Sequence, residues 1–183
     1  MKVLIINGIT NDPSYNAIES EIEADLTSLS THDVDYFKLR DMNINFCTGC
    51  WDCWVKTPGL CAIKDDQSMI LEKFVQADTV LFISPVIVGY ESALLKKTKD
   101  RIIPIAHPYI EMYNGEQHHR QRYPKSPEFN VLLIEDDFTE KEDITIIEET
   151  YQRISLNFKS TLKKLYSINS KGGNGHVLSH FKW

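Results

Sequence analysis

The chain has 183 residues, of which 42% are hydrophobic and 25% are charged, with 8 glycines and 7 prolines. This composition is that of an ordinary folded protein and excludes disordered, collagen-like and repeat proteins. The 26 acidic residues outnumber the 20 basic ones and give a net charge of -6, which opposes nucleic-acid binding because phosphate neutralisation requires a basic surface.

The first half of the chain predicts alternating strands and helices. An apolar run at 3–7 predicts a buried strand, and Asp12-Pro13-Ser14 predicts the cap of a helix whose apolar residues recur at helical spacing as far as Leu29. A weaker strand is predicted at 34–39, and a second helix is expected to begin at Asp66. The first run is too short for a signal peptide and no stretch is long enough to cross a membrane, so we expect a cytoplasmic protein.

The second half continues this alternation. A second apolar run at 79–84 predicts a buried strand, followed by a helix after Glu91 that we expect to end or kink near Pro104. A third buried run lies at 130–135, and the longest helix is predicted over 144–165. None of the three buried runs alternates apolar with polar residues, which indicates strands of a parallel sheet that is covered on both faces.

This order predicts an α/β fold over one domain spanning 1–183: a flavodoxin-like three-layer sandwich with a doubly wound parallel sheet, strand order 2-1-3-4-5, and helices on both faces. The fifth strand is either 165–169 or 176–181, and a flexible C-terminal tail is expected from about residue 170. Segments 40–65 and 107–128 are predicted to be long loops, which in a compact domain tend to be functional.

Two loops are expected to face each other at the carboxyl ends of the strands, where such sheets bind ligands. The first, 8–16, leads into a helix N-terminus that can bind phosphate, and the second, 85–92, offers a turn on which a flat ring could lie. An ordinary capped helix is the alternative for the first loop, since the Asp12 carboxylate would then occupy the phosphate position. The expected ligand-binding residues are Thr10, Asn11, Ser14, Tyr15, Asn16, Pro85, Val86, Ile87, Val88, Gly89 and Ser92.

Several motifs in residues 1 to 105 resemble the NADPH-dependent FMN reductase family of flavodoxin-like proteins. Asn7-Gly8 and the following loop are similar to that family's Gly-Ser-Pro-Arg-x-x-Gly-Asn-Thr phosphate loop, and the segments containing Asp65-Asp66, Ser84-Pro85-Val86 and Asp100-Arg101 resemble its central block. The resemblance implies bound FMN, with its phosphate on the first loop and its isoalloxazine ring against 85–92. It also implies NAD(P)H as an electron donor, and homodimers or homotetramers.

The phosphate loop departs from the family pattern. Ile9, Thr10 and Asn11 replace the family's Ser, Pro and Arg, which removes a charge-assisted phosphate contact and is expected to lower FMN affinity. Ile87 replaces the usual tyrosine after Pro-Val, so ring stacking there is expected to be weaker.

All four cysteines fall in one short segment, as in metal sites rather than disulfide scaffolds. Closely spaced thiolates on a glycine-containing loop can surround one centre, and four thiolates suit a [4Fe-4S] cluster or zinc, while reduced thiols or a redox disulfide are further alternatives. The spacing also resembles the motif of iron-sulfur flavoproteins, a branch of the same family, which implies a [4Fe-4S] cluster. Because the segment follows the second strand, we expect it at the carboxyl edge near the flavin. The candidate metal ligands are Cys47, Cys50, Cys53 and Cys61.

The sequence and its resemblance together favour an FMN-binding oxidoreductase that transfers electrons between NAD(P)H or a redox carrier and a small-molecule or protein acceptor. Two alternatives remain: a non-enzymatic electron carrier containing FMN and a [4Fe-4S] cluster, and a flavin-free or zinc-stabilised binding protein of the same fold. No catalytic acid or base can be named from the sequence.

Overall fold

The computed structural model describes residues 1–172 and 175–183. Its main sheet contains five parallel strands in the order β2-β1-β3-β7-β8, which confirms the flavodoxin-like order expected from the sequence. A short strand, β4 (Tyr90–Glu91), pairs antiparallel with the end of β3. The five parallel strands are β1 (Lys2–Asn7), β2 (Asp33–Lys38), β3 (Thr79–Ile87), β7 (Glu128–Glu135) and β8 (Leu162–Asn169).

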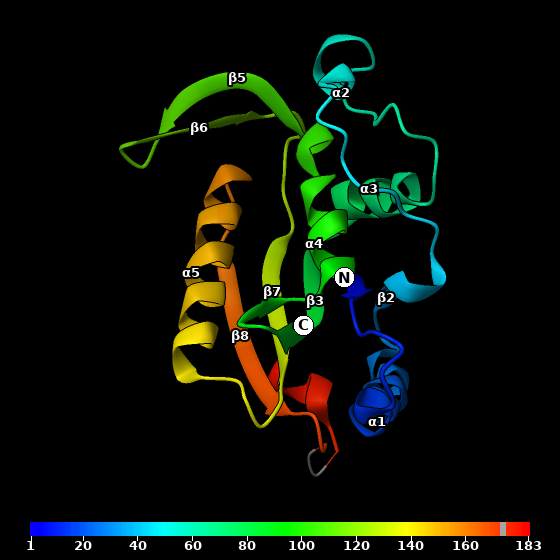
Figure 1. Cartoon of the computed structure of the whole chain (residues 1–183). Helices are drawn as coiled ribbons and strands as arrows, with labels where there is room; N and C mark the ends of the chain where they lie inside the picture. Colours follow the sequence, from blue (N-terminus) through cyan, green and yellow to red (C-terminus); the bar gives the residue numbers. More distant parts are fainter. Residues whose placement is uncertain (173–174) are drawn as a thin grey trace.

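Helices cover both faces of the sheet (Figure 1). Short 3-10 turns extend α1 at both ends, and another follows α4. The α-helices are α1 (Asn16–Leu26), α2 (Asp52–Val55), α3 (Gln67–Gln76), α4 (Ala93–Asp100) and α5 (Lys141–Asn157). The 3-10 helices are η1 (Pro13–Tyr15), η2 (Thr27–Leu29), η3 (Leu39–Asp41), η4 (Ile103–Ile105) and η5 (Val177–His180).

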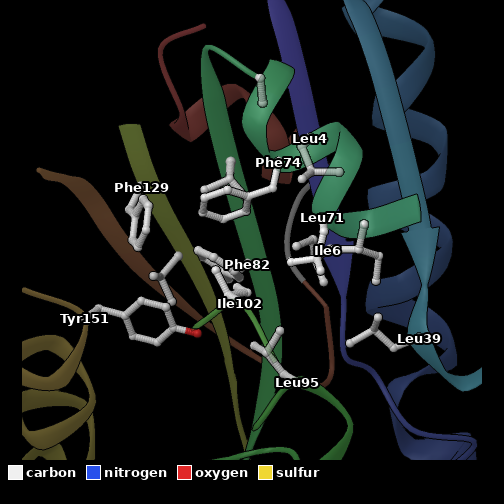
Figure 2. Close-up of a cluster of buried hydrophobic side chains, with 14 of the residues drawn as sticks. Leu4, Ile6, Leu39, Leu71, Phe74, Phe82, Leu95, Ile102, Phe129 and Tyr151 are labelled. Carbon is white, nitrogen blue, oxygen red and sulfur yellow. The ribbon is translucent and has the colours of Figure 1, made fainter. Parts of the chain in front are cut away.

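Alternate residues of β1 enter two separate cores. Leu4 and Ile6 pack with the residues of α3, α4 and α5, where the rings of Phe74 and Phe129 meet edge to face with their centroids 5.9 Å apart (Figure 2). Val3 and Ile5 pack on the opposite face with α1 and η5. Because both faces of the central strands are buried, β1 and β3 are mostly apolar, whereas the edge strands β2 and β8 also carry charged residues.

The longest predicted helix was placed too far along the chain. α5 ends at Asn157, and residues 162 to 169 form β8 instead. Lys159 adopts a left-handed conformation with φ 51°, and the Ser160 N–H donates to the Ser155 carbonyl oxygen at 2.9 Å, which closes the last turn. Neither glycine nor proline marks this stop, so the apolar spacing of the following strand was read as a continuation of the helix.

The predicted loop at 107–128 was also wrong. Most of it forms an antiparallel hairpin of β5 (Ala106–Tyr113) and β6 (Glu116–Gln121), which projects from the sheet (Figure 1). Asn114 and Gly115 both have positive φ in its turn, and Asn-Gly is a strong signal for such hairpins.

Part of the C-terminal segment expected to be a flexible tail is packed. Val177, Leu178 and Phe181 are buried with α1 in the second core. The predicted flexible residues 173 and 174 lie outside the described residues. Within the described chain, no helix has the length and apolar character needed to span a membrane.

Candidate functional site

The predicted ligand-binding loops meet at the N-terminal end of α4. The Ser92 hydroxyl donates to the Gly8 carbonyl oxygen at 2.7 Å, and the Gly8 N–H donates to the Ile83 carbonyl oxygen at 2.8 Å. A Cβ atom on Gly8 would lie 2.9 Å from both the Ser92 hydroxyl oxygen and the Leu95 Cβ. Only glycine therefore allows this close approach of the loop after β1 to the start of α4.

Asn7 and Asp12 shape the first loop. The Asn7 side-chain oxygen accepts from the Ile9 N–H at 2.8 Å, while its amide donates to the Tyr36 hydroxyl oxygen at 2.7 Å. Asp12 caps η1, as the sequence predicts, by accepting from the Ser14 N–H at 2.9 Å. This hydrogen bond lowers the pKa of Asp12, so its carboxylate is ionised in the loop where a phosphate would bind.

A second carboxylate faces the same edge. Burial raises the pKa of Tyr15, and the negative charges of Asp12 and Asp136 raise it further. Asp136 also lines a small pocket with Val88 and Gly89 of the second loop. Asp136 follows β7, and its carboxylate accepts from the Thr139 hydroxyl at 2.8 Å. The hydroxyl and amide donors of the loop therefore lie in an acidic surrounding that weakens anion binding.

The residues predicted to bind a ligand differ widely in exposure. Asn11, Ser14, Asn16, Ile87 and Val88 are exposed, and Thr10 and Gly89 are half-buried. The remaining predicted residues, Tyr15, Pro85, Val86 and Ser92, are buried. The exposed donors suit a phosphate, whereas the Ser92 hydroxyl is engaged with Gly8 and also caps α4 by accepting from the Leu95 N–H at 3.2 Å.

The second loop is a tight turn between β3 and β4. Val88 and Gly89 both have positive φ, at 51° and 74°, and Val88 is 99% exposed. A valine rarely adopts this conformation because its branched side chain crowds the backbone. The turn thus presents the apolar side chains of Ile87 and Val88 at the surface, beside the loop after β7.

The cysteine segment lies at the opposite end of α4, which corrects the expectation that it would lie at the carboxyl edge. Arg101, directly after α4, donates to the Cys61 sulfur at 3.3 Å, and the Trp54 indole donates to the Ala106 carbonyl oxygen at 3.0 Å. An eight-residue helix is about 12 Å long. The chain between β2 and α3 is long enough to run back along the sheet, and Figure 1 shows α2 beside the β5–β6 hairpin.

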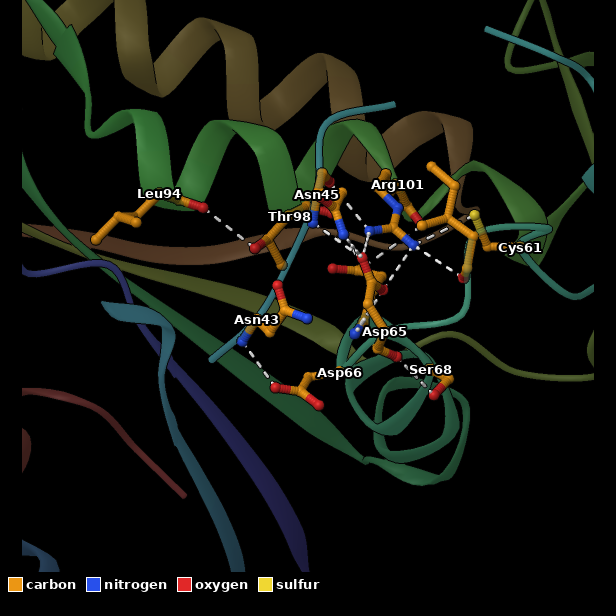
Figure 3. Close-up of polar contacts among 11 residues, drawn as sticks. Asn43, Asn45, Cys61, Asp65, Asp66, Ser68, Leu94, Thr98 and Arg101 are labelled. Atoms are coloured by element: carbon orange, nitrogen blue, oxygen red, sulfur yellow. Dashed lines mark hydrogen bonds and ion pairs between the residues drawn. The ribbon is translucent and has the colours of Figure 1, made fainter. Parts of the chain in front are cut away.

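A buried ion pair fixes the cysteine segment to α4 (Figure 3). The Arg101 guanidinium donates to the two Asp65 carboxylate oxygens at 2.6 and 2.9 Å and to the Asn45 carbonyl oxygen at 3.0 Å. Burial alone would raise the pKa of Asp65, but the hydrogen bonds from Arg101 and Asn45 outweigh it and hold the pKa well below its ordinary value. The sequence identified Asp65 and Arg101 only as family-like motifs, because nothing local shows that they pair.

The four cysteines line one pocket of about 60 Å³ together with Arg101. Cys53 is buried, Cys61 is half-buried, and Cys47 and Cys50 are exposed. Burial raises the pKa of the Cys53 thiol, and the charges of the other three cysteines add to this effect. Among the residues that the structure describes, no three Cys, His, Asp or Glu side chains converge closely enough to hold a single metal ion.

Left-handed residues allow the cysteine segment to turn around this pocket. Gly49 and Trp51 have φ values of 65° and 61°, and Gly59 has φ 89°. The Trp51 and Trp54 rings lie 4.9 Å apart, and Trp54 also lies 5.1 Å from the His119 ring of β6. The segment is therefore anchored both to α4 and to the hairpin, and its thiols share one side.

Comparison with protein families gives one match over most of the chain. The family model for NADPH-dependent FMN reductases matches residues 1–120, which include both predicted ligand-binding loops and all four cysteines.

Curated relatives match about half of the chain or less. An iron-sulfur flavoprotein of Archaeoglobus fulgidus is 32% identical over 101 residues, which cover 55% of this chain and 48% of that protein. An iron-sulfur flavoprotein of Methanocaldococcus jannaschii is 40% identical over 73 residues, covering 40% of this chain and 37% of that protein. The chain thus aligns with about half or less of the length of these relatives.

Solved structures share the fold at low sequence identity. An azoreductase from Bacillus anthracis has a TM-score of 0.65 and 16% identity, covering 92% of this chain and 86% of that chain. An NAD(P)H:quinone oxidoreductase from Methanothermobacter marburgensis has a TM-score of 0.57 and 17% identity, covering 97% and 89%. These similarities establish the flavodoxin-like fold.

Proposed function

The chain belongs to the NADPH-dependent FMN reductase family, and from this premise we propose that it is an FMN-dependent oxidoreductase that takes electrons from NAD(P)H or a redox carrier and passes them to a small-molecule or protein acceptor. The observation that carries the proposal is the Ser92–Gly8 hydrogen bond, which joins the two loops at the point where the strand order reverses. When bound there, FMN supplies both one-electron and two-electron chemistry.

The residues of the first loop suit the phosphate of FMN. Thr10 and Ser14 offer hydroxyl donors, and Asn11 and Asn16 offer amide donors on the exposed side of the loop. Tyr15 fixes the loop by entering the second core. Asp12 opposes the phosphate charge, so the chain binds FMN through neutral donors and with reduced affinity.

The residues of the second loop suit the isoalloxazine ring. Pro85 and Val86 are buried and hold the turn, while Ile87, Val88 and Gly89 form a surface against which a flat ring can pack. Ser92 acts as a positioning residue, because its side chain holds the two loops together.

An FMN titration tests this proposal. Protein purified without oxygen should show flavin absorption or acquire it when FMN is added. Thr10→Val should weaken FMN binding about tenfold, since a hydrogen bond to a charged group is lost. Ser20→Ala, on the exposed side of α1, should leave FMN affinity unchanged. A wild-type protein that binds no added FMN would contradict the proposal, and unchanged affinity in Thr10→Val would contradict the role of Thr10.

We further propose that Cys47, Cys50, Cys53 and Cys61 hold a [4Fe-4S] cluster. Their shared pocket supports this proposal, as does the similarity of the chain to proteins named iron-sulfur flavoproteins. Each cysteine of such a cluster binds a different iron, so its four sulfur atoms stand further apart than the ligands of one zinc ion. The four thiols line a single pocket, which suits a centre that all four bind.

Metal analysis separates the alternatives for the cysteines. A cluster predicts about four iron and four sulfide per chain, and Cys53→Ser should lower both, whereas Thr48→Val, in the same pocket, should not. One zinc per chain without iron would contradict the cluster.

Stoichiometric iron and FMN without NAD(P)H oxidation would instead favour the non-enzymatic electron carrier, for which the cysteine pocket is the specific observation.

We also propose that the protein forms homodimers or homotetramers. Tyr109, Ile110 and Met112 of β5 are 65%, 54% and 66% exposed, and a projecting two-stranded hairpin gains stability from a covering surface. Light scattering should report a dimer or tetramer that Met112→Glu weakens and that Met69→Glu, on α3, leaves intact. A monomer at all concentrations would contradict the proposal.

A further inference from the structure

A cavity of about 360 Å³ lies between α4, α5 and the base of the β5–β6 hairpin. This volume is within the range of small-molecule sites. Tyr90, at the end of the second proposed FMN loop, is the one lining residue from either loop, and no lining residue belongs to the cysteine segment. Its walls are mostly apolar and are formed in part by Phe82, Ile102, Ile103, Phe129, Ile154 and Phe158.

One wall carries a buried lysine. The Lys99 ammonium donates to the Glu91 carboxylate at 2.8 Å and lies 3.8 Å from the centroid of the Tyr151 ring. The Tyr151 hydroxyl donates to the same Glu91 oxygen at 2.7 Å. The side chains of Lys99 and Glu91 are only 6% and 0% exposed. A charged pair in this position is unusual because desolvation is costly, and burial lowers the pKa of Lys99.

The lysine retains hydrogen-bonding capacity. An ammonium has three N–H donors, and within the described chain Lys99 has one hydrogen-bond partner and one aromatic contact. The other oxygen of Glu91, Oε1, is buried and has no hydrogen-bond partner among the described residues. Glu91 already balances the lysine charge, and its free oxygen repels a second anion. A neutral acceptor is therefore the partner that suits the remaining N–H.

We propose that this cavity binds a small neutral aromatic compound with a carbonyl group, whose oxygen accepts a hydrogen bond from Lys99. The half-buried rings of Tyr90 and Phe158 pack against the aromatic part of the ligand, with the buried rings of Phe82 and Phe129 behind them. The site adds a binding function that the FMN-dependent oxidoreductase does not require.

Fluorescence of prodan, a neutral naphthyl ketone, tests the site with the full chain. Its emission should shift to shorter wavelength and saturate at one molecule per chain, whereas the anionic probe anilinonaphthalene sulfonate should bind at least tenfold more weakly. Ile154→Trp fills the cavity and should abolish the saturable shift. If that variant does not fold by circular dichroism, Ala106→Leu replaces it as the blocking variant.

A paired substitution tests the hydrogen bond. Lys99→Met with Glu91→Gln removes the donor without leaving a buried unpaired charge, and should weaken prodan binding about tenfold or more. Dimethylaminonaphthalene, which lacks the carbonyl, should bind this variant and the wild type equally. Lys97→Met, on the same helix but outside the cavity lining, should bind prodan normally. Unchanged prodan affinity in the paired variant, or in a folded blocking variant, would overturn the proposal.

Discussion

The two ends of α4 are fastened in different ways. At its start, neutral groups join the two loops proposed to bind FMN: the Ser92 hydroxyl donates to the Gly8 carbonyl oxygen. At its end, Arg101 and Asp65 form a bidentate ion pair whose side chains are 1% and 0% exposed, and Arg101 also reaches Cys61. The contact at the start of α4 depends on the small size of Gly8, which lets the first loop approach the helix closely. The contact at its end depends on two buried charges that compensate each other.

This difference has a consequence for each candidate site. A neutral hydrogen bond contributes less to stability than a buried ion pair, which suits loops that we propose to admit a ligand. A buried ion pair is costly to break because the remaining charge has no water around it. The cysteine segment is therefore expected to be the more rigid of the two, which suits a centre that needs its thiols at fixed positions.

The largest effect should come from breaking the ion pair. Arg101→Met leaves the Asp65 carboxylate buried without its partner and should lower the free energy of unfolding by about 3–5 kcal/mol. Lys96→Met is the matched control, because its pair with Asp100 lies on the same helix with side chains 45% and 47% exposed and should cost at most about 0.5 kcal/mol. Urea denaturation measures both. Equal losses would remove the distinction between buried and exposed pairs.

Low pH should lower the stability of the protein through the same end of α4. The folded pKa of Asp65 is below its ordinary value of 3.8, so its contribution to stability is complete above that pH and is lost as the pH falls below it. Unfolding free energies measured from about pH 6 to about pH 3 should fall more steeply in the wild type than in Arg101→Met. Parallel curves would show that other carboxylates dominate the acid response.

A smaller effect is expected at the start of α4. Gly8→Ala places a Cβ atom 2.9 Å from Leu95 and Ser92, and should cost about 1–3 kcal/mol through overpacking. Ala93→Ser, on the exposed first residue of α4, should change stability by less than about 0.5 kcal/mol. Thermal and urea unfolding compare the two. A neutral Gly8→Ala would mean that the two loops can separate without cost.

The smallest effect concerns ligand charge and rests on the proposed FMN site. Asp12→Asn keeps a good capping side chain but removes a negative charge, and should raise FMN affinity about fivefold at low salt. The gain should shrink as salt is added. Asp41→Asn, an exposed carboxylate outside the loop, should have no effect. An unchanged affinity in Asp12→Asn would show that the carboxylate does not face the phosphate.

Local sequence patterns predicted most of the fold. The apolar runs predicted β1, β3 and β7, and Asp12 was recognised as a helix cap. The end of α5 was missed because Lys159 turns the chain without glycine or proline, and the apolar residues of β8 happen to keep helical spacing. The Asn114-Gly115 pair, with positive φ at both residues, is itself a local signal for the hairpin that replaces the predicted loop.

The sequence predicted some of the candidate sites but not others. The loop after β1 and the loop after β3 meet as expected, since parallel strands bring their carboxyl ends to one edge. The cysteines share a pocket, as their spacing indicated, but that pocket lies at the other end of α4. The Lys99–Glu91 pair and its cavity had no sequence signal, because charged residues eight positions apart are usually exposed.

The sequence by itself determined the buried strands, the capped helix after β1 and the grouping of four thiols, because each depends on residues that are close neighbours along the chain, and its motifs indicated the family. Only the tertiary structure decided that Arg101 pairs with Asp65, 36 positions away, and that Ser92 bonds to Gly8, 84 positions away. Such contacts form when the sheet brings distant segments together. Because these contacts are buried, removing one charge or adding one methyl group there changes the stability of the fold by about 1–5 kcal/mol.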